Sequence, residues 1–274
     1  MSSLFDTHLN PLDRERLRAD FQAARPFHFI CVDGLLRAEF AEQVARAYPT
    51  FAEARRVGKT FATVNERGKV QISDPQHFPE PIRTLHEILA APEFLATLSH
   101  ITDIPALLAD EQLAGGGMHL MAANSRLDLH ADFNIIPRRG LYRRLNILLF
   151  LNRDWPAAWG GGLQLWDATV THCDREVAPI LNRCVLFETT APGFHGVSKV
   201  GCPEAMTRNS FAAYYYTTQP PPDWTGPAYS TEFRARPDEW LKGLILMPAE
   251  TIGNQAIELA RRAKRRLGQI VRGL

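Results

Sequence analysis

The hydrophobic pattern of the chain changes near Gly115. Before this point, apolar residues recur at intervals of three and four, which is typical of amphipathic helices. After it, short runs rich in β-branched and aromatic residues are separated by Gly, Pro, Asn and Asp, which is typical of strands joined by turns. We therefore expect a first part that is mostly helical and a second part that is mostly β.

The N-terminal part predicts several helices around one short strand. A helix is expected to begin at Pro11, after the capping residue Asn10, because proline suits the first turn of a helix. The expected helices span residues 11–24, 36–48, 81–90 and 92–101, the strand spans residues 27–32, and an extended piece spans residues 70–73. None of these segments carries candidate chemistry, so this part is expected to act as a cover.

The second part predicts antiparallel strands joined by turns, as in the two sheets of a jelly roll. The expected strands span residues 117–122, 127–132, 144–151, 163–166, 169–177, 181–188, 195–200 and 208–217. We expect the barrel to end before residues 220–222, because these prolines lack the N–H donor that a central strand needs.

The last segment, residues 251–274, has the pattern of a basic amphipathic helix. Its apolar residues at helical spacing are Ile252, Ala256, Leu259, Ala263, Leu267, Ile270 and Leu274. Its charged residues are Arg261, Arg262, Lys264, Arg265, Arg266 and Arg272, against Glu258. Two interpretations stay open, namely packing on its own domain and peripheral contact with an anionic membrane or an acidic partner.

The composition is that of a folded globular protein, since 45% of the 274 residues are hydrophobic and 22% are charged. A net charge of +1 excludes a globally basic protein, so no nucleic-acid partner is expected. The four cysteines show no C-x-x-C spacing and are expected to be free thiols. No apolar run approaches the ~18 residues needed to cross a bilayer, and the N-terminus lacks a signal-peptide pattern, so we expect a cytoplasmic protein.

Two of the nine histidines occur in an H-x-D triplet, His130-Ala131-Asp132 and His172-Cys173-Asp174. In a strand, residues i and i+2 point to the same side, so the first triplet would place an imidazole and a carboxylate on one face. The second triplet lies beside Arg175 and Glu176 and is better explained as a polar hairpin turn. We therefore take only His130 and Asp132 as metal-ligand candidates.

His195, on a late strand, is the third candidate ligand, and Arg208 follows it on the last strand. Two histidines and one carboxylate on one face of an iron leave three positions open for a chelating cosubstrate and dioxygen. The planar guanidinium of an arginine can pair through two hydrogen bonds with a carboxylate of that cosubstrate. The ordered set predicts an iron-dependent oxygenase site, whereas each residue alone would more often be structural.

In these residues the chain resembles the iron(II)- and 2-oxoglutarate-dependent oxygenases, in particular the prolyl 4-hydroxylase-like branch. The resemblance extends from about residue 27 to 217 and rests further on residues 115–119 (GGGMH), 127–134 (LDLHADFN), 142–152 (YRRLNILLFLN), 160–167 (GGGLQLWD) and 214–216 (YYY). It implies an α+β protein with a mainly β core, a double-stranded β-helix (jelly roll). We expect three regions: an N-terminal helical cover (1–110) integrated with the core, the catalytic core (111–218), and a proline-rich connection with the basic C-terminal helix (219–274).

The resemblance also implies roles for individual residues. His130, Asp132 and His195 would bind iron and form the catalytic centre, while Arg208 and Ser210 would hold the distal carboxylate of 2-oxoglutarate. Asn146, which is followed on the same strand face by Leu148 and Phe150, would line the cosubstrate pocket with Leu163 opposite. Phe150 departs from the family, because many relatives carry a tyrosine there whose hydroxyl reaches the cosubstrate.

The implied activity is hydroxylation of an unactivated carbon with release of succinate and carbon dioxide, stimulated by ascorbate. A prolyl or related peptidyl residue is the first expected substrate, and an amino acid or saccharide, or a jelly-roll binding protein without turnover, are the alternatives. The resemblance does not identify the substrate or the oligomeric state. Near the expected pocket mouth, Arg138, Arg139, Trp155 and Trp159 suggest either a cradle for an anionic or ring-bearing substrate or a solvated loop.

Overall fold

The structure is a computed structural model that describes residues 4–189 and 193–247, except Asp223, Thr225, Pro227 and Trp240. The α-helices are α1 (Leu4–His8), α2 (Arg14–Ala23), α3 (Ala38–Arg46), α4 (Phe51–Val57), α5 (Glu80–Ala90) and α6 (Pro92–Thr102). Short 3-10 turns are η1 (Pro75–His77), η2 (Ala157–Trp159) and η3 (Pro237–Glu239), and η4 (Lys242–Leu246) is a π-helical turn.

The strands lie mostly in the second part of the chain. They are β1 (Phe29–Asp33), β2 (Lys59–Ala62), β3 (Glu66–Ile72), β4 (Leu108–Ala109), β5 (Gly117–Ala131), β6 (Ile135–Ile136), β7 (Leu141–Phe150), β8 (Leu163–Trp166), β9 (Cys173–Val177), β10 (Arg183–Glu188), β11 (Phe194–Val197), β12 (Arg208–Thr217) and β13 (Glu232–Arg234).

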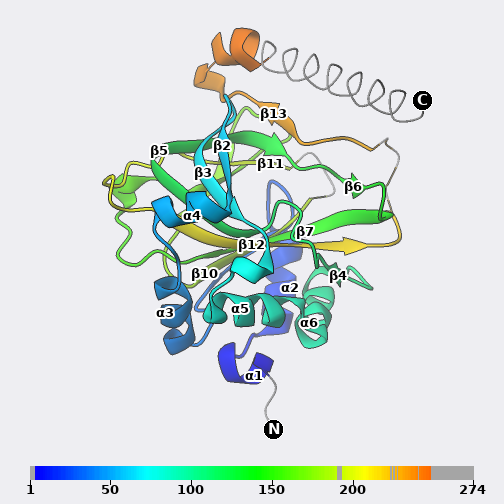
Figure 1. Ribbon diagram of the computed structural model, residues 1–274. Coiled ribbons are helices and arrows are strands. Elements are labelled where there is room, and N and C mark those ends of the chain that lie inside the picture. The colour runs from blue at the N-terminus through cyan, green and yellow to red at the C-terminus, as the bar shows by residue number, and fades with distance from the viewer. Residues whose placement is uncertain are drawn as a thin grey trace, which may run out of the picture.

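All strand pairings are antiparallel, and the strands follow the order β1-β10-β7-β12-β5-β11-β8-β9. Strand β5 connects the two halves of this order. Its first part pairs with β12, from Gly117 to Met121, and its second part pairs with β11, from Leu127 to His130. The sheet therefore curls around β5 into the jelly roll expected from the strand count. Strands β3 and β13 also pair with β5, β2 pairs with β3, and all three lie toward the top of Figure 1.

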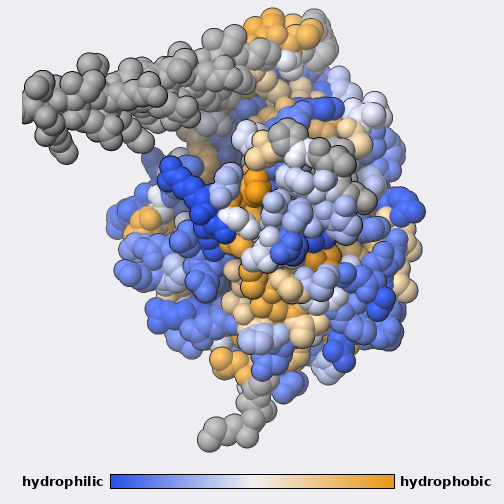
Figure 2. Space-filling model, turned by 90° about the vertical axis from the view of Figure 1, so that its right-hand side faces the viewer, coloured by the Kyte–Doolittle hydropathy of each residue, from blue (hydrophilic) through white to orange (hydrophobic). Residues whose placement is uncertain are grey.

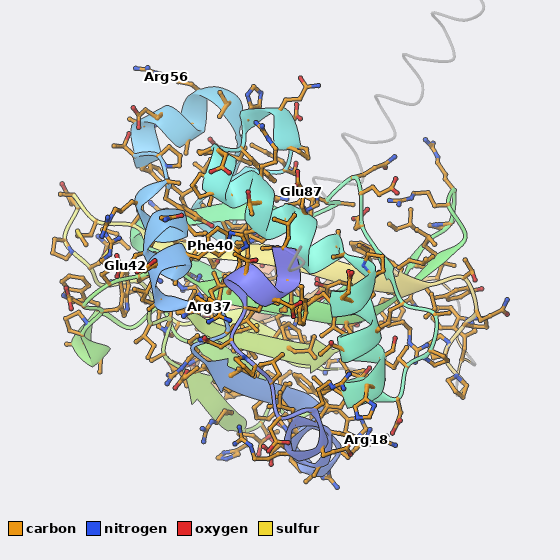
Figure 3. All side chains as sticks on the ribbon, turned by 90° about the horizontal axis from the view of Figure 1, so that it is seen from below. Arg18, Arg37, Phe40, Glu42, Arg56 and Glu87 are labelled. Carbon is orange, nitrogen blue, oxygen red and sulfur yellow. The ribbon has the colours of Figure 1, made fainter. Side chains whose placement is uncertain are left out.

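The helices cover one face of the sheet, as the view from below shows (Figure 3). The alternation along β7 and β12 explains why. Leu145, Ile147 and Leu149 of β7 belong to the main core with Phe211 and Tyr215 of β12. The helical residues of this core include Leu17 and Phe21 of α2, Phe40 and Val44 of α3, Ile82 and Leu85 of α5, and Phe94 and Leu98 of α6. Residues of the opposite parity on β7 and β12 are thereby left for the other face of the sheet.

Several predicted elements differ from the observed ones. The two strands expected over residues 117–122 and 127–132 are one strand, β5, which bends around Asn124 at a positive φ of 61°. The strand expected from residue 169 begins at Cys173, because Asp167 accepts hydrogen bonds from the backbone of Thr169, Thr171 and His172 and closes a turn. The sequence pattern also missed α4 and the hairpin partner β2.

We expected the sheet to end before the prolines at residues 220–222, and this prediction was wrong. After them the chain returns to the sheet, where β13 pairs with the end of β5, and Phe233 lies opposite His130. The following segment is held to β5 by ion pairs from Arg236 and Lys242 to the buried Asp128.

Other sequence predictions concern the end of the chain and its boundaries. Residues 251–274, with the expected basic helix, lie outside the described residues. Just before them, Leu241, Leu244, Ile245 and Leu246 are exposed, and an apolar patch is visible at the top of Figure 2. Within the described ranges, no helix has the length and apolarity needed to span a bilayer. The four cysteines are free, and the division at residues 110 and 218 stays a prediction.

Candidate active site

A cavity of about 430 Å³ opens on the face of the sheet opposite the helices. His130, Asp132 and His195 lie on its wall, at the meeting point of β5 and β11. His130 and His195 are directly opposite each other in the β5–β11 register, and Asp132 follows the last residue of β5. One ligand atom from each of the three residues lies within 4.8 Å of the others, a spacing suited to a single metal ion.

Backbone carbonyls orient both imidazoles toward the carboxylate. The Nδ1 atom of His130 lies 2.9 Å from the carbonyl oxygen of Asp128, and Nδ1 of His195 lies 3.3 Å from that of Gly193. When Nδ1 carries the proton, it donates to these carbonyls and the Nε2 lone pairs are free for a metal. The Nε2 atoms of His130 and His195 lie 3.8 and 3.5 Å from carboxylate oxygens of Asp132.

The charges of the site match the protonation states that metal binding needs. Burial and the neighbouring His130 lower the pKa of His195 to about 3, so its ring is neutral at neutral pH. Burial alone would raise the pKa of Asp132, but the Arg143 guanidinium and the two imidazoles, with the Asn146 hydrogen bond, hold it well below its usual range. The site thus presents a neutral imidazole at His195 and an ionised carboxylate at Asp132.

Arg208 lies in the same cavity on β12 and is only 3% exposed. Its Nε donates to the carbonyl oxygen of Gly161 at 2.5 Å, and its Nη1 lies 3.5 Å from the hydroxyl of Ser210. Gly161 adopts a positive φ of 71°, and an added Cβ there would lie 3.1 Å from the Arg208 side chain. Burial lowers the pKa of Arg208 to about 10, so it stays charged at neutral pH.

The guanidinium of Arg208 forms no ion pair with any carboxylate of the described residues. Instead it packs over the ring of Phe150, with 5.0 Å between its central carbon and the ring centroid. A buried charge without a counter-ion is unfavourable, and a bound carboxylate would compensate it. This orphaned cation fits a carboxylate ligand such as 2-oxoglutarate.

A second buried arginine, Arg143 of β7, lies on the other side of the site and was not singled out from the sequence. Its Nη2 lies 3.0 Å from Oδ2 of Asp132, and its Nε donates to Oδ1 of Asn146 at 2.9 Å. Asn146 in turn donates from Nδ2 to Oδ2 of Asp132 at 2.7 Å. In a regular strand Asn146 and Arg144 share one face and Arg143 points to the other, so the sequence pattern did not predict that Arg143 lies at the site.

Residues 116–216 match the family model described as the 2OG-Fe(II) oxygenase superfamily. The protein carries a 2OG-Fe(II) oxygenase domain. The matched residues contain His130, Asp132, His195 and Arg208, and the cofactors of this superfamily are iron(II) and 2-oxoglutarate. No curated protein matches the sequence.

A solved structure with a TM-score above 0.5 supports the same fold. A prolyl hydroxylase from Trichoplax adhaerens, in complex with a hypoxia inducible factor peptide fragment, is 18% identical with a TM-score of 0.51, covering 74% of this chain and 90% of its own. A prolyl-4-hydroxylase from Pseudomonas putida is also 18% identical, with a TM-score of 0.49 and coverage of 73% and 98%. HygX from Streptomyces hygroscopicus, with nickel, 2-oxoglutarate and hygromycin B bound, is 13% identical, with a TM-score of 0.48 and coverage of 80% and 96%.

The residues expected to form the cosubstrate pocket of the oxygenase domain are close together. Asn146, Leu148, Leu163 and Ser210 line the cavity with Arg208. Phe150 is fully buried and does not line the cavity, but its ring packs against the guanidinium of Arg208. The second H-x-D triplet is not part of the site, since His172 and Asp174 lie exposed at the hairpin between β8 and β9.

Of the two interpretations of Arg138, Arg139, Trp155 and Trp159, a substrate cradle or a solvated loop with hydrophobic anchors, the structure favours the second, since none of the four lines the cavity. Arg139 is bound to Asp110, and Trp155 packs edge-on against Trp159 in an apolar cluster with Met121 and Val197. The cavity wall is formed instead by the hairpin of β2 and β3 and by β13, which the sequence pattern had largely missed. The cavity-lining residues of these strands are Lys59, Phe61, Glu66, Lys69, Gln71 and Phe233.

Proposed function

We propose that this protein is an iron(II)- and 2-oxoglutarate-dependent hydroxylase in which His130, Asp132 and His195 bind the iron. Arg208 and Ser210 bind the distal carboxylate of 2-oxoglutarate. The observation that carries this proposal is the buried, charged Arg208, which has no carboxylate partner among the described residues and shares one cavity with His130, Asp132 and His195.

The iron, when bound, supplies activation of dioxygen coupled to oxidative decarboxylation of 2-oxoglutarate. The residues of the chain orient the reactants and exclude water. The carbonyls of Asp128 and Gly193 fix both imidazoles, and the fork of Arg208 fixes the cosubstrate at its far end. Leu148 and Leu163 supply apolar walls that keep water from the middle of the cosubstrate.

Asp132 favours hydroxylation over halogenation. Halogenating members of the superfamily carry a small residue at this position, which frees a coordination site for chloride. A carboxylate here fills that site, so transfer of a hydroxyl group to the substrate carbon is the expected outcome.

A prolyl or related peptidyl residue is our first candidate substrate. Its support is the shared fold with a prolyl hydroxylase crystallised with a peptide. A small molecule with an anionic group is the second candidate, because Lys59 and the buried Lys69 both lie against the ring of Phe61 in the cavity wall. Lys69 is paired with Glu66 at 3.1 Å, so of these two lysines Lys59 is the one left to attract a carboxylate or phosphate.

The first experiment is anaerobic addition of iron(II) and 2-oxoglutarate to the purified protein. We expect the weak visible metal-to-ligand charge-transfer band of the ternary complex, followed after oxygen addition by succinate formation that peptide or small-molecule panels stimulate. The panel member that raises turnover identifies the substrate class. Folded, metal-replete protein that gives neither band nor succinate would instead indicate a binding protein without turnover.

A further inference from the structure

A β-bulge in β7 turns Arg143 toward the metal-ligand site. In the pairing of β7 with β12, Leu145 lies opposite Tyr215, but Arg143 lies opposite Tyr216, so Arg144 is an extra residue. Asn146 lies opposite Tyr214. Because Tyr214 and Tyr216 share a face, Arg143 and Asn146 share it too, although they are three residues apart. Bulges re-aim side chains in this way beside active sites.

The Arg143 side chain is held firmly in this position. The residue is 2% exposed, and its central carbon lies 3.7 Å from the ring centroid of Tyr214 and 4.6 Å from that of Phe133. Tyr214 is itself fixed by its hydroxyl, which donates to the carbonyl oxygen of Gly115 at 2.8 Å. With the guanidinium plane fixed by two rings, its N–H groups point in set directions.

These directions treat the two oxygens of Asp132 differently. Oδ2 receives Nδ2 of Asn146 at 2.7 Å and faces Nη2 of Arg143 at 3.0 Å. Oδ1 accepts no hydrogen bond from any residue in the described part of the chain. Nε2 of His130 lies 3.8 Å from Oδ1, and Nε2 of His195 lies 3.5 Å from Oδ2. Each oxygen thus faces one imidazole, but Oδ2 also has two polar partners on β7, the Asn146 amide that donates to it and the Arg143 guanidinium that pairs with it.

We propose that Arg143 is a positioning residue that holds Oδ2 of Asp132, so that the carboxylate binds the iron through Oδ1 alone. The inference rests on the proposed function. A two-histidine, one-carboxylate site keeps three positions open only if the carboxylate takes one position, and 2-oxoglutarate with dioxygen needs all three. A carboxylate bound through both oxygens would occupy one of these three open coordination positions.

Arg143→Gln tests this role, because glutamine removes the charge and the fork while keeping a polar side chain. We expect the affinity for iron(II), measured by titration without 2-oxoglutarate, to fall about 10- to 100-fold, the usual effect of losing an outer partner of a ligand. The absorption spectrum of the cobalt(II)-loaded variant, which reports ligand number and geometry, should also change. Arg143→Lys should recover part of the affinity, since it retains the charge without the fork.

Arg144→Gln is the matched control. Arg144 is an adjacent, similarly buried arginine that bonds to Thr217 and does not line the cavity. Its substitution should leave metal affinity and the cobalt spectrum unchanged. If Arg143→Gln does not fold, Asn146→Ser replaces it, because it removes the other donor to Oδ2 and should change the spectrum in the same direction with a smaller loss of affinity.

Unchanged metal affinity and spectrum in folded Arg143→Gln would overturn the inference. If that variant instead raised only the KM of a substrate found in the panels, Arg143 would be a substrate-binding residue. Failure of the wild-type protein to bind iron(II) or cobalt(II) at all would refute the proposed function itself, which is a different result.

Discussion

Two arginines are buried in the same cavity, and they differ in their partners. Arg143 faces a carboxylate, Asp132, and stacks on two aromatic rings, whereas Arg208 contacts a carbonyl, a hydroxyl and a thioether and has no carboxylate among the described residues. Burial alone would lower the pKa of Arg143, but Asp132 raises it above its usual value. For Arg208, burial acts alone and lowers the pKa to about 10.

This difference in partners indicates different roles for the two arginines, since one holds a residue of the protein and the other binds a ligand. A buried cation whose charge is already balanced holds its partner in place, as we infer for Arg143. A buried cation that lacks a partner is arranged for an anion that arrives from outside. The two arginines therefore have different roles because the carboxylate of Arg143 belongs to the protein, whereas the carboxylate proposed for Arg208 belongs to the cosubstrate.

The largest expected effect comes from Asp132→Ala, which would make Arg143 resemble Arg208. Loss of a ligand should abolish iron(II) binding and succinate formation. In the metal-free protein the variant leaves Arg143 buried and unpaired, so the free energy of unfolding should fall by about 3–5 kcal/mol. Calorimetric metal titration and urea unfolding measure the two effects.

Asp174→Ala is the control for that prediction, because Asp174 belongs to the second H-x-D triplet and is exposed. It should change neither quantity. Metal binding that survives in Asp132→Ala but disappears in Asp174→Ala would reverse our choice between the two triplets.

Arg208→Ala should have the next largest effect, and on the cosubstrate alone. Removal of one partner of a buried charge pair weakens binding by ~2–5 kcal/mol, so the Kd for 2-oxoglutarate should rise roughly 30- to several thousand-fold. Iron(II) affinity without 2-oxoglutarate should stay close to wild type. This profile is opposite to the one expected for Arg143→Gln, and similar profiles for both variants would contradict the proposed division of roles.

Residues on regular strands could be assigned to the site from the sequence, whereas residues at a bulge or on strands added by long-range pairing could not. His130, His195 and Arg208 lie on strands and Asp132 directly follows one, so the alternation and spacing of these residues predicted that they share one site. Arg143 lies at a bulge, which breaks the period by one residue, so its role was invisible. The substrate wall was missed because β2, β3 and β13 are added to the sheet by long-range pairing, which local patterns do not encode.

Acid should destabilise the metal-free site through His195 while both arginines stay charged. Burial and His130 lower its folded pKa to about 3, below the ordinary value of 6.5, so the unfolded chain binds more protons between these values. The free energy of unfolding should therefore fall as the pH is lowered from 6.5 toward 4. Urea titrations across this range should show a shallower fall for His195→Gln, and equal slopes would contradict the low pKa.

The smallest predicted effect is that of Ser210→Ala, which tests how much of the anion site Arg208 supplies by itself. Ser210 lies two residues along β12 from Arg208, its hydroxyl is 3.5 Å from Nη1, and it lines the cavity. With Phe150 in place of a tyrosine, this hydroxyl is the second donor that we assign to the distal carboxylate. A hydrogen bond to a charged group contributes ~1.5–3 kcal/mol, so the Kd for 2-oxoglutarate should rise roughly 10- to 100-fold.

Ser210→Thr keeps the hydroxyl and should retain most of the affinity that Ser210→Ala loses. If Ser210→Ala binds 2-oxoglutarate as tightly as wild type, the hydroxyl serves only to orient the Arg208 guanidinium or is replaced by water. The anion site would then consist of one arginine on the ring of Phe150, and the whole difference between the two buried arginines would lie in their carboxylate partners.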